Sequence, residues 1–280
     1  MSKRTEIGKV ISEVREIPKV VMTFENWGVY FLNVFGLSKN ETVCKLRNGT
    51  KFIIRSNSFD TRMIKEVYIH KPYHRLKINK GDVIVDIGAH IGTFSIMAGR
   101  KTGETGKVYA YEPVPNTFDI LKRNIYINSL QNIVHPYKLG ISDKTGEKEF
   151  YMFKKDDKPL FHSSSFYREQ TGVIGASISE KIEVECITLE DIFESNGLDR
   201  IDVLKMDCEG EEYNLLFGTS NEYLKRVSRM CIEYHDYLPT KYNHQDLINY
   251  LSELKYDVLH EVPKNSEKGC GIIYAWGKGN

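Results

Sequence analysis

The sequence contains no apolar run near the roughly 18 residues that a membrane-spanning helix needs, so we expect no membrane segment. Residues 1–20 also lack the apolar core of a secretory signal peptide. The five cysteines are dispersed and form no CxxC pair, a pattern that argues against a disulfide scaffold and against a zinc site. Together these absences predict reduced thiols and a cytoplasmic location.

The sequence also lacks an excess of charge of either sign. It carries 39 Lys and Arg residues against 38 Asp and Glu residues, a formal net charge of +1. Without a basic excess there is no general attraction to nucleic acid or to an anionic membrane surface, so we expect neither as a partner. No pattern in the sequence indicates an oligomeric state.

A chain of 280 residues with 41% hydrophobic residues is long enough to bury a substantial core. We expect two parts, an extension of helices and a β-hairpin at residues 1–80 and a main domain at residues 81–280. In the extension, the two apolar segments 43–46 and 52–55 flank Asn48-Gly49, a dipeptide favoured in type I′ hairpin turns. Residues 60–70 have the spacing of a helix.

From residue 82 onward, strand-like apolar runs alternate with helical patterns. This alternation predicts a parallel sheet with helices on both faces. The expected strands lie at residues 83–87, 107–111, 133–139, 147–153, 181–187, 201–206, 230–234, 256–261 and 271–276. The expected helices lie at residues 93–99, 116–128, 189–196, 213–218 and 245–254.

The first strand of the main domain runs into a glycine-bounded turn, Asp86-x-Gly88-x-x-x-Gly92, followed by Thr93 at the start of a helix. Such a turn brings backbone N–H groups close to a ligand. It differs from the dinucleotide fingerprint GxGxxG, because His90 stands where the second glycine admits a pyrophosphate. An acidic residue at the strand end would repel phosphate and attract an ammonium group. A small ligand without pyrophosphate is favoured; a simple tight turn is the alternative.

A second acidic residue follows the next strand. Glu112 ends Tyr109-Ala110-Tyr111 and lies 26 residues after Asp86. This is close to the roughly 20-residue offset at which an acid accepts hydrogen bonds from both ribose hydroxyls. We expect Asn116, just beyond Pro113, to cap the next helix and to border the same pocket. A nucleoside that carries a cation and no phosphate fits these residues, and S-adenosylmethionine is such a molecule.

The third strand ends in Leu139-Gly140-Ile141-Ser142-Asp143. In this architecture Ile141 is placed to lie against an adenine ring, and Ser142 or Asp143 to accept a hydrogen bond from its amino group. A Ser-Asp pair after a strand is also a common turn, so both interpretations stand.

Ionisable residues follow a later apolar strand at every second position, namely Lys205, Asp207 and Glu209. On a strand they would point the same way, at the carboxyl edge where open α/β sheets bind ligands. A lysine between two carboxylates either pairs for stability or takes part in proton transfer.

Together these segments resemble the FkbM family of S-adenosylmethionine-dependent methyltransferases. The resemblance covers roughly residues 45–237 and is most specific in VIVDIGAHIGTFS, YAYEP, ITLEDIF and DVLKMDCEGEE, although the family usually has Asn at the position of His90. It implies the Rossmann-like class I methyltransferase fold, a mostly parallel seven-stranded α/β sheet with an antiparallel C-terminal strand. It also implies O-methylation of a hydroxyl on a sugar, a glycan or a small secondary metabolite.

The candidate catalytic residues are two carboxylates and a histidine that could accept the hydroxyl proton, with a lysine as charge partner or donor: Asp207, Glu209, His235 and Lys205. A structural histidine is equally consistent with His235. Asp207 could also contact the cofactor, and Asp207 with Glu233 offers hard oxygen ligands, but no spacing demands a metal and we assign none. The alternatives are a cofactor-binding protein without transfer activity and an RNA methyltransferase.

Overall fold

The computed structural model describes residues 16–56, 58–70, 72–155, 158–160, 164–169, 171, 175–238, 240–263 and 269–277. The chain forms two compact units that divide between Pro72 and Tyr73, inside the 3-10 helix η2 (Pro72–Arg75). In the described part, none of the helices is long and apolar enough to cross a membrane.

The first unit contains the β-hairpin expected from the sequence, with Thr42 opposite Ile54 in an antiparallel pair. The prediction of a type I′ turn is wrong, because Gly49 has a positive φ of +82° and Asn48 does not. The turn is longer than two residues, closed by the Leu46 N–H to Thr50 carbonyl hydrogen bond of 2.8 Å. The elements of this unit are α2 (Trp27–Val34), β1 (Thr42–Lys45), β2 (Lys51–Ile54), α3 (Asp60–Lys65) and the π-helix η1 (Glu66–His70).

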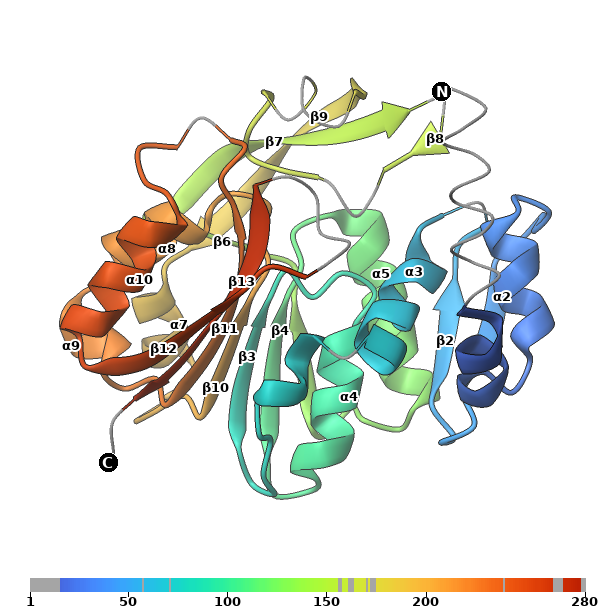
Figure 1. Cartoon of the computed structure of the whole chain (residues 1–280), viewed down its shortest axis with the longest axis horizontal. Coiled ribbons are helices and arrows are strands. Elements are labelled where there is room, and N and C mark those ends of the chain that lie inside the picture. The colour runs from blue at the N-terminus through green and yellow to red at the C-terminus, as the bar shows by residue number, and fades with distance from the viewer. Residues whose placement is uncertain are drawn as a thin grey trace. The chain divides into compact units, whose positions relative to one another are not determined.

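The second unit is built on a seven-stranded sheet in the order β12-β13-β11-β10-β3-β4-β5 (Figure 1). Its strands are β3 (Val83–Ile87), β4 (Lys107–Tyr111), β5 (Val134–Tyr137), β10 (Val203–Met206), β11 (Arg229–His235), β12 (Tyr256–Glu261) and β13 (Cys270–Gly277). The strands from β11 to β5 are parallel, and β13 is antiparallel to both β11 and β12. The mostly parallel sheet with an antiparallel C-terminal strand is therefore confirmed.

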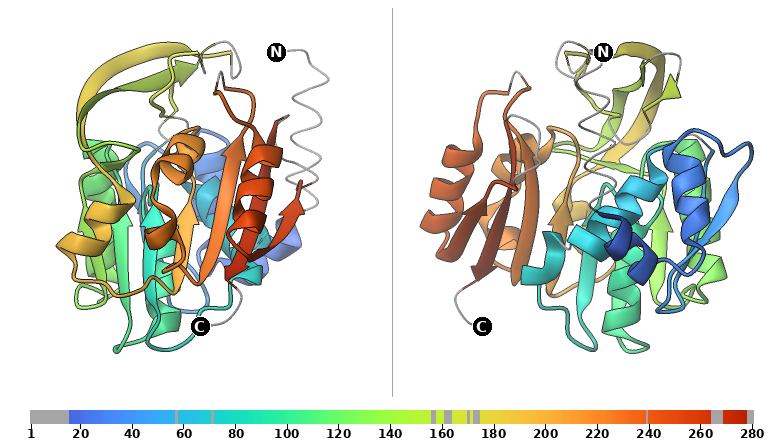
Figure 2. Two further views of the ribbon diagram at one scale, coloured as in Figure 1. Left: turned by 90° about the vertical axis from the view of Figure 1, so that its left-hand side faces the viewer. Right: turned by 45° about the vertical axis from the view of Figure 1, so that its right-hand side comes forward.

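Helices cover both faces of this sheet, with α4 and α5 on one face and α7, α8 and α10 on the other (Figures 1 and 2). The bounds are α4 (Thr93–Thr102), α5 (Pro115–Ile127), α7 (Leu189–Ser195), α8 (Glu212–Gly218), α9 (Asn221–Leu224) and α10 (His244–Glu253). Apolar side chains of α7, α8 and α10 form one buried core with those of β3, β10 and β11. Burial of this apolar surface is the main force that holds the layers together.

A smaller sheet, in the order β6-β9-β7-β8, is inserted after β5. Its strands are β6 (Gly140–Ile141), β7 (Gly146–Lys155), β8 (Lys158–Pro159) and β9 (Ser177–Ile187), so both added strands expected from the sequence are present and longer. The β7–β9 pair extends past the carboxyl ends of the main strands (Figures 1 and 2). Ser165, between β8 and β9, donates a 2.7 Å hydrogen bond to the carbonyl of Glu209 and so ties the insertion to the end of β10.

Helix α7 begins with a capping box that gives a pH-dependent prediction. The Asp191 carboxylate accepts from the Thr145 hydroxyl and the Thr188 N–H, and these hydrogen bonds lower its pKa. Because the folded pKa is the lower one, this stabilisation is complete above about pH 4 and is lost as the pH falls through the folded value. We expect Asp191→Asn to lower the free energy of unfolding by about 1 kcal/mol at pH 7 and by less at pH 3.

Urea unfolding at both pH values measures this difference. Glu185→Gln, at an exposed position of β9, is the control and should change little at either pH. If Asp191→Asn lowers the free energy of unfolding equally at pH 3 and pH 7, the stabilisation does not come from the ionised Asp191 carboxylate.

Candidate functional site

The turn between β3 and α4 has glycines where the backbone requires them. Gly88 has φ of +74°, and a Cβ atom there would lie 1.9 Å from the carbonyl oxygen of Asp207. Gly92 has φ of +87°, and its Cβ would lie 2.6 Å from a methyl of Leu121. Thr93 follows as the first, buried residue of α4. Both glycines therefore serve close packing inside the protein as well as the shape of the turn.

The carboxylate of Asp86 is fully buried and is bound within the protein. It accepts a 2.5 Å hydrogen bond from Ser95 and lies 3.2 Å from the ammonium of Lys205. Lys205 also donates to the carbonyls of Ile87 and Gly88, at 3.2 and 2.8 Å. Asp86 thus pairs with an ammonium group, as expected of its charge, but this group is a side chain of the protein that fixes the turn.

Burial by itself lowers the pKa of Lys205, but the neighbouring carboxylates of Asp86 and Asp207 outweigh it and raise the pKa above the usual range. Lys205 therefore stays charged at neutral pH, and it acts as an anchor and hydrogen-bond donor.

Glu112 lies at the end of β4, beside the β3–α4 turn, and is almost fully buried. One carboxylate oxygen accepts from the N–H of His90 at 2.9 Å, and the other accepts from the N–H of Val114 at 2.9 Å. Asn116 is exposed, and the prediction that it caps α5 is wrong. Val114 is the cap, because Pro115 takes the first helical position. Glu112 therefore places negative charge directly on the turn.

The end of β10 departs from the expected period of two. The strand ends at Met206, and only Lys205 of the three ionisable residues belongs to it. Asp207 still faces Lys205, with 3.7 Å between Oδ2 and Nζ. Glu209 instead has φ of +53°, which turns its carboxylate to the hydroxyl of Tyr237 at 3.3 Å. The expectation that all three point one way is wrong at Glu209.

His235 is the last residue of β11 and is buried between two carboxylates. Its Nδ1 lies 3.1 Å from Glu212, and its Nε2 lies 3.8 Å from Glu209. Burial lowers the pKa of His235, but Glu212 and Glu209 outweigh it and raise the pKa well above 6.5. Glu212 also accepts from the N–H groups of Cys208 and Gly210, at 2.9 Å each, and so holds the whole loop.

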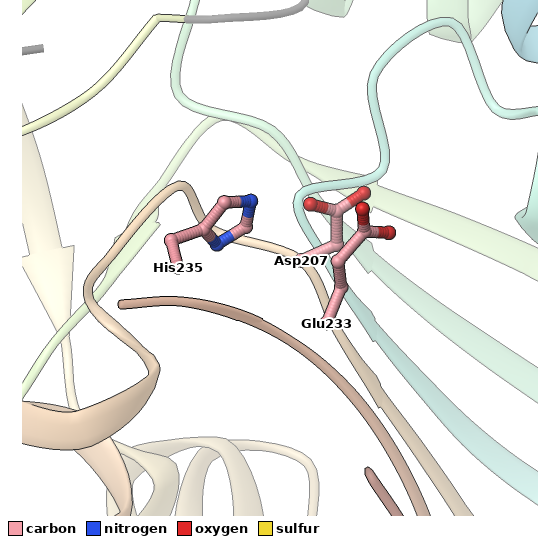
Figure 3. Close-up of side chains that lie close together, drawn as sticks. All are labelled: Asp207, Glu233 and His235. Carbon is pink, nitrogen blue, oxygen red and sulfur yellow. The ribbon is translucent and has the colours of Figure 1, made fainter. Parts of the chain in front are cut away.

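Asp207, Glu233 and His235 come together at the ends of β10 and β11, as Figure 3 shows. One ligand atom from each lies within 4.8 Å of the others. The strand register explains this, because Lys205 pairs with Cys231 and the next same-face positions are Asp207 and Glu233. We assigned no metal from the sequence, but Asp207, Glu233 and His235 form a set that can hold a metal ion.

Ile141 is buried in β6, and Ser142, which follows it, belongs to a polar cluster that includes Lys148 of β7. The Ser142 hydroxyl contacts Glu211 and Lys148, and Lys148 lies 2.9 Å from Asp143. The ammonium of Lys148 is also 3.0 Å from Glu211. Ser142 is therefore held by side chains of the protein, as is Asp143.

Reasoning from the sequence missed Glu212 and gave Glu233 only a minor place. Glu212 begins α8, where an acidic residue is explained by the helix dipole alone. For Glu233 a signal was present, since it alternates with His235 along one strand.

Residues 86–258 match the model of the methyltransferase FkbM domain. Methyltransferase sdnD of Sordaria araneosa is 29% identical over 188 aligned positions, covering 60% of this chain and 72% of that protein. The 31-O-demethyl-FK506 methyltransferase FkbM of Streptomyces tacrolimicus is 26% identical, covering 69% of this chain and 81% of the relative. Hexuronic acid methyltransferase AglP of Haloferax volcanii is 28% identical, covering 62% and 63%.

Among solved structures, methyltransferase FkbM from Methylobacillus flagellatus KT matches with a TM-score of 0.50 and 17% identity. The match covers 76% of this chain and 48% of that protein, so this chain spans about half its length. At this identity the likeness concerns the fold, which is the Rossmann-like fold of class I methyltransferases.

Proposed function

The chain is a methyltransferase of the FkbM family, and on that premise we propose that it transfers a methyl group from S-adenosylmethionine to a hydroxyl of a sugar, glycan or small metabolite. The observation that carries the choice of cofactor is the bond from the His90 N–H to the Glu112 carboxylate. It places a carboxylate on the amide that a pyrophosphate would need, so a phosphate-bearing dinucleotide is disfavoured.

The groups at this turn fit S-adenosylmethionine. The carboxylate of Glu112 accepts the N–H groups of His90 and Val114, and a carboxylate at this position is the acceptor that ribose hydroxyls need. A positively charged sulfonium is also favoured near Asp207 and Glu209, which stand at the end of β10. Ile141 and Ser142 remain the proposed border of the adenine.

When bound, S-adenosylmethionine supplies an electrophilic methyl group on sulfur. The protein then has to orient the acceptor hydroxyl and remove its proton. Lys205 keeps its own proton, and His235 holds one between Glu209 and Glu212. Asp207 faces the ammonium of Lys205 at 3.7 Å, which favours its charged form and makes it a weak proton acceptor, so Glu209 is the proposed base.

Backbone conformation supports this choice. In the described part of the chain, the non-glycine residues with positive φ are His90, Ser129, Glu209 and Lys255. Ser129 and Lys255 directly follow helices α5 and α10, where such a conformation is common. His90 and Glu209 instead lie in the loops that follow β3 and β10, at the carboxyl edge of the sheet, where such conformations are often part of a functional site.

The cofactor proposal predicts that Glu112→Gln binds S-adenosylmethionine about tenfold or more weakly, because an amide cannot replace a charged acceptor for the ribose hydroxyls. Titration calorimetry measures the affinity, with NAD⁺ as a parallel ligand. Glu104→Gln is the control and should bind as the wild type does, because Glu104 lies in an exposed turn before the amino end of β4, away from the carboxyl ends of the strands. Unchanged affinity in a folded Glu112→Gln variant, or tighter binding of NAD⁺, would reject the placement.

Transfer itself is tested with S-adenosylmethionine labelled in its methyl group, incubated with the protein and separately with glycans, small hydroxylated metabolites and RNA. The proposal expects label in a glycan or metabolite, stable to mild alkali, because a methyl ether survives conditions that hydrolyse a methyl ester. Label in RNA would favour an RNA methyltransferase. Binding of the cofactor without labelled product in any fraction would favour a protein that has kept the pocket alone.

A further inference from the structure

We propose that Asp207, Glu233 and His235 bind one divalent first-row transition-metal cation at the ends of β10 and β11. One ligand atom from each residue lies within 4.8 Å of the others, a spacing that a single ion can bridge by small side-chain rotations. Figure 3 shows the three side chains directed into a common space, with the ring nitrogen farther from the backbone facing the two carboxylates. Each ligand comes from a strand end fixed by the sheet.

The surroundings of His235 provide the second argument. The ring is nine-tenths buried or more, and its Nδ1 is bound by Glu212. Within the described residues, Nε2 has no hydrogen bond, and its ion-pair distance to Glu209 is long at 3.8 Å. A histidine held by a carboxylate at one nitrogen, with the other directed at acidic groups, is the usual arrangement around a metal ion.

Glu212 is suited to that orienting role. Its carboxylate is fully buried and also accepts from the N–H groups of Cys208 and Gly210, so it is held at three points. A carboxylate fixed in this way sets the tautomer and the direction of the imidazole. Glu212 would act as a positioning residue and would not touch the ion.

The charge and the chemical type of the ligands narrow the choice of metal ion. Two carboxylates and a neutral imidazole balance a charge of +2, once Nε2 has released its proton to solvent. The ammonium of Lys205 lies 3.7 Å from Oδ2 of Asp207 and is closer to Asp86, at 3.2 Å, so its contact with Asp207 is the weaker of the two. Oxygen and imidazole ligands together suit Mn²⁺ or Zn²⁺ better than Ca²⁺.

Three protein ligands leave coordination positions open, and the Asp207 side chain is 29% exposed, so the ion would be reachable from solvent. In a part of the inference that rests on the proposed function, the acceptor hydroxyl would bind the ion through its oxygen. Coordination lowers the pKa of the hydroxyl, and its proton passes to Glu209 as the O–H bond breaks. The site would thus favour acceptors that offer a metal-binding hydroxyl.

The test uses the full chain, freed of metal with a chelator and then titrated with Mn²⁺ while free Mn²⁺ is followed by electron paramagnetic resonance. We expect one bound Mn²⁺ per chain, displaced by Zn²⁺, and tenfold or greater weakening in Asp207→Asn, Glu233→Gln and His235→Gln. Glu212→Gln should weaken binding by about 10–100-fold without removing a ligand. Glu149→Gln, an exposed carboxylate paired with Lys181 on the insertion, is the control and should match the wild type.

Spin-echo spectra of bound Mn²⁺ test whether His235 touches the ion. A coordinated imidazole gives a nitrogen coupling, which His235→Gln should remove and which a purely structural histidine would not produce. Absence of bound Mn²⁺ and Zn²⁺ in the wild type, or a site that persists unchanged in the folded variants, would overturn the inference. Methyl transfer that continues after the chelator has removed the bound ion would reject the part of the metal in transfer and leave the proposed function intact. Metal binding by a protein that transfers no methyl group to any acceptor would support the metal site and reject the proposed function.

Discussion

Gly88→Ala is expected to lower the free energy of unfolding by about 3–5 kcal/mol, enough to leave much of the protein unfolded at 37 °C. Two effects add. A residue with a Cβ atom is strained at φ of +74°, and that atom would stand 1.9 Å from the backbone oxygen of Asp207. Because backbone cannot rotate away as a side-chain tip can, β3 and β10 would have to separate locally.

The matched control is Gly197→Ala, which follows α7. Gly197 has φ of +60°, and no atom lies within 4 Å of where its Cβ would be. It shares the strain and lacks the clash, so we expect it to lower stability by only about 1–2 kcal/mol. Urea unfolding followed by circular dichroism gives both values. Equal losses in the two variants would show that strain alone explains Gly88.

Lys205→Met is the second large effect, with an expected loss of about 3–5 kcal/mol in the free energy of unfolding. The variant keeps most of the apolar length of the side chain but leaves Asp86 as a buried charge that still accepts the hydrogen bond from Ser95. The carbonyls of Ile87 and Gly88 also lose the Lys205 donor, although that of Ile87 keeps a backbone N–H donor at 3.2 Å. Most of the loss comes from the uncompensated charge.

A double variant separates the charge from the packing. Lys205→Met combined with Asp86→Asn removes both charges and should recover part of the lost stability, which a double-mutant cycle in urea unfolding measures. Lys122→Met breaks the exposed pair with Asp119 and should change stability by less than about 1 kcal/mol. A Lys205→Met loss as small as this would refute a structural role for the buried pair.

The strands around the site were predictable because each is a buried run ended by a residue that cannot continue it. Strands β3 and β4 begin and end where the sequence places them, with Gly88 and Glu112-Pro113 directly beyond. The capping of α5 was misplaced by two residues, since Asn116 is a good cap only where no proline precedes it.

The contacts of the site were less predictable, because they depend on register between strands that are distant in the sequence. Asp86 pairs with Lys205 only because β3 and β10 are neighbours with these residues opposite each other. The positive φ of Glu209 is likewise invisible in its sequence, and it redirects this carboxylate toward Tyr237 and His235. Residue types were foreseeable, and their partners were not.

The bond from Ser165 to the backbone of Glu209 has a consequence for protein engineering. The β7–β9 insertion is not an independent cassette, because it also contacts this loop through Lys148 and Tyr167, which reach Glu211 at 3.0 and 3.4 Å. A chimera that exchanges the insertion alone would leave Glu211 without these neighbours. Recombination between relatives should therefore transfer residues 140–187 and 207–214 as one block.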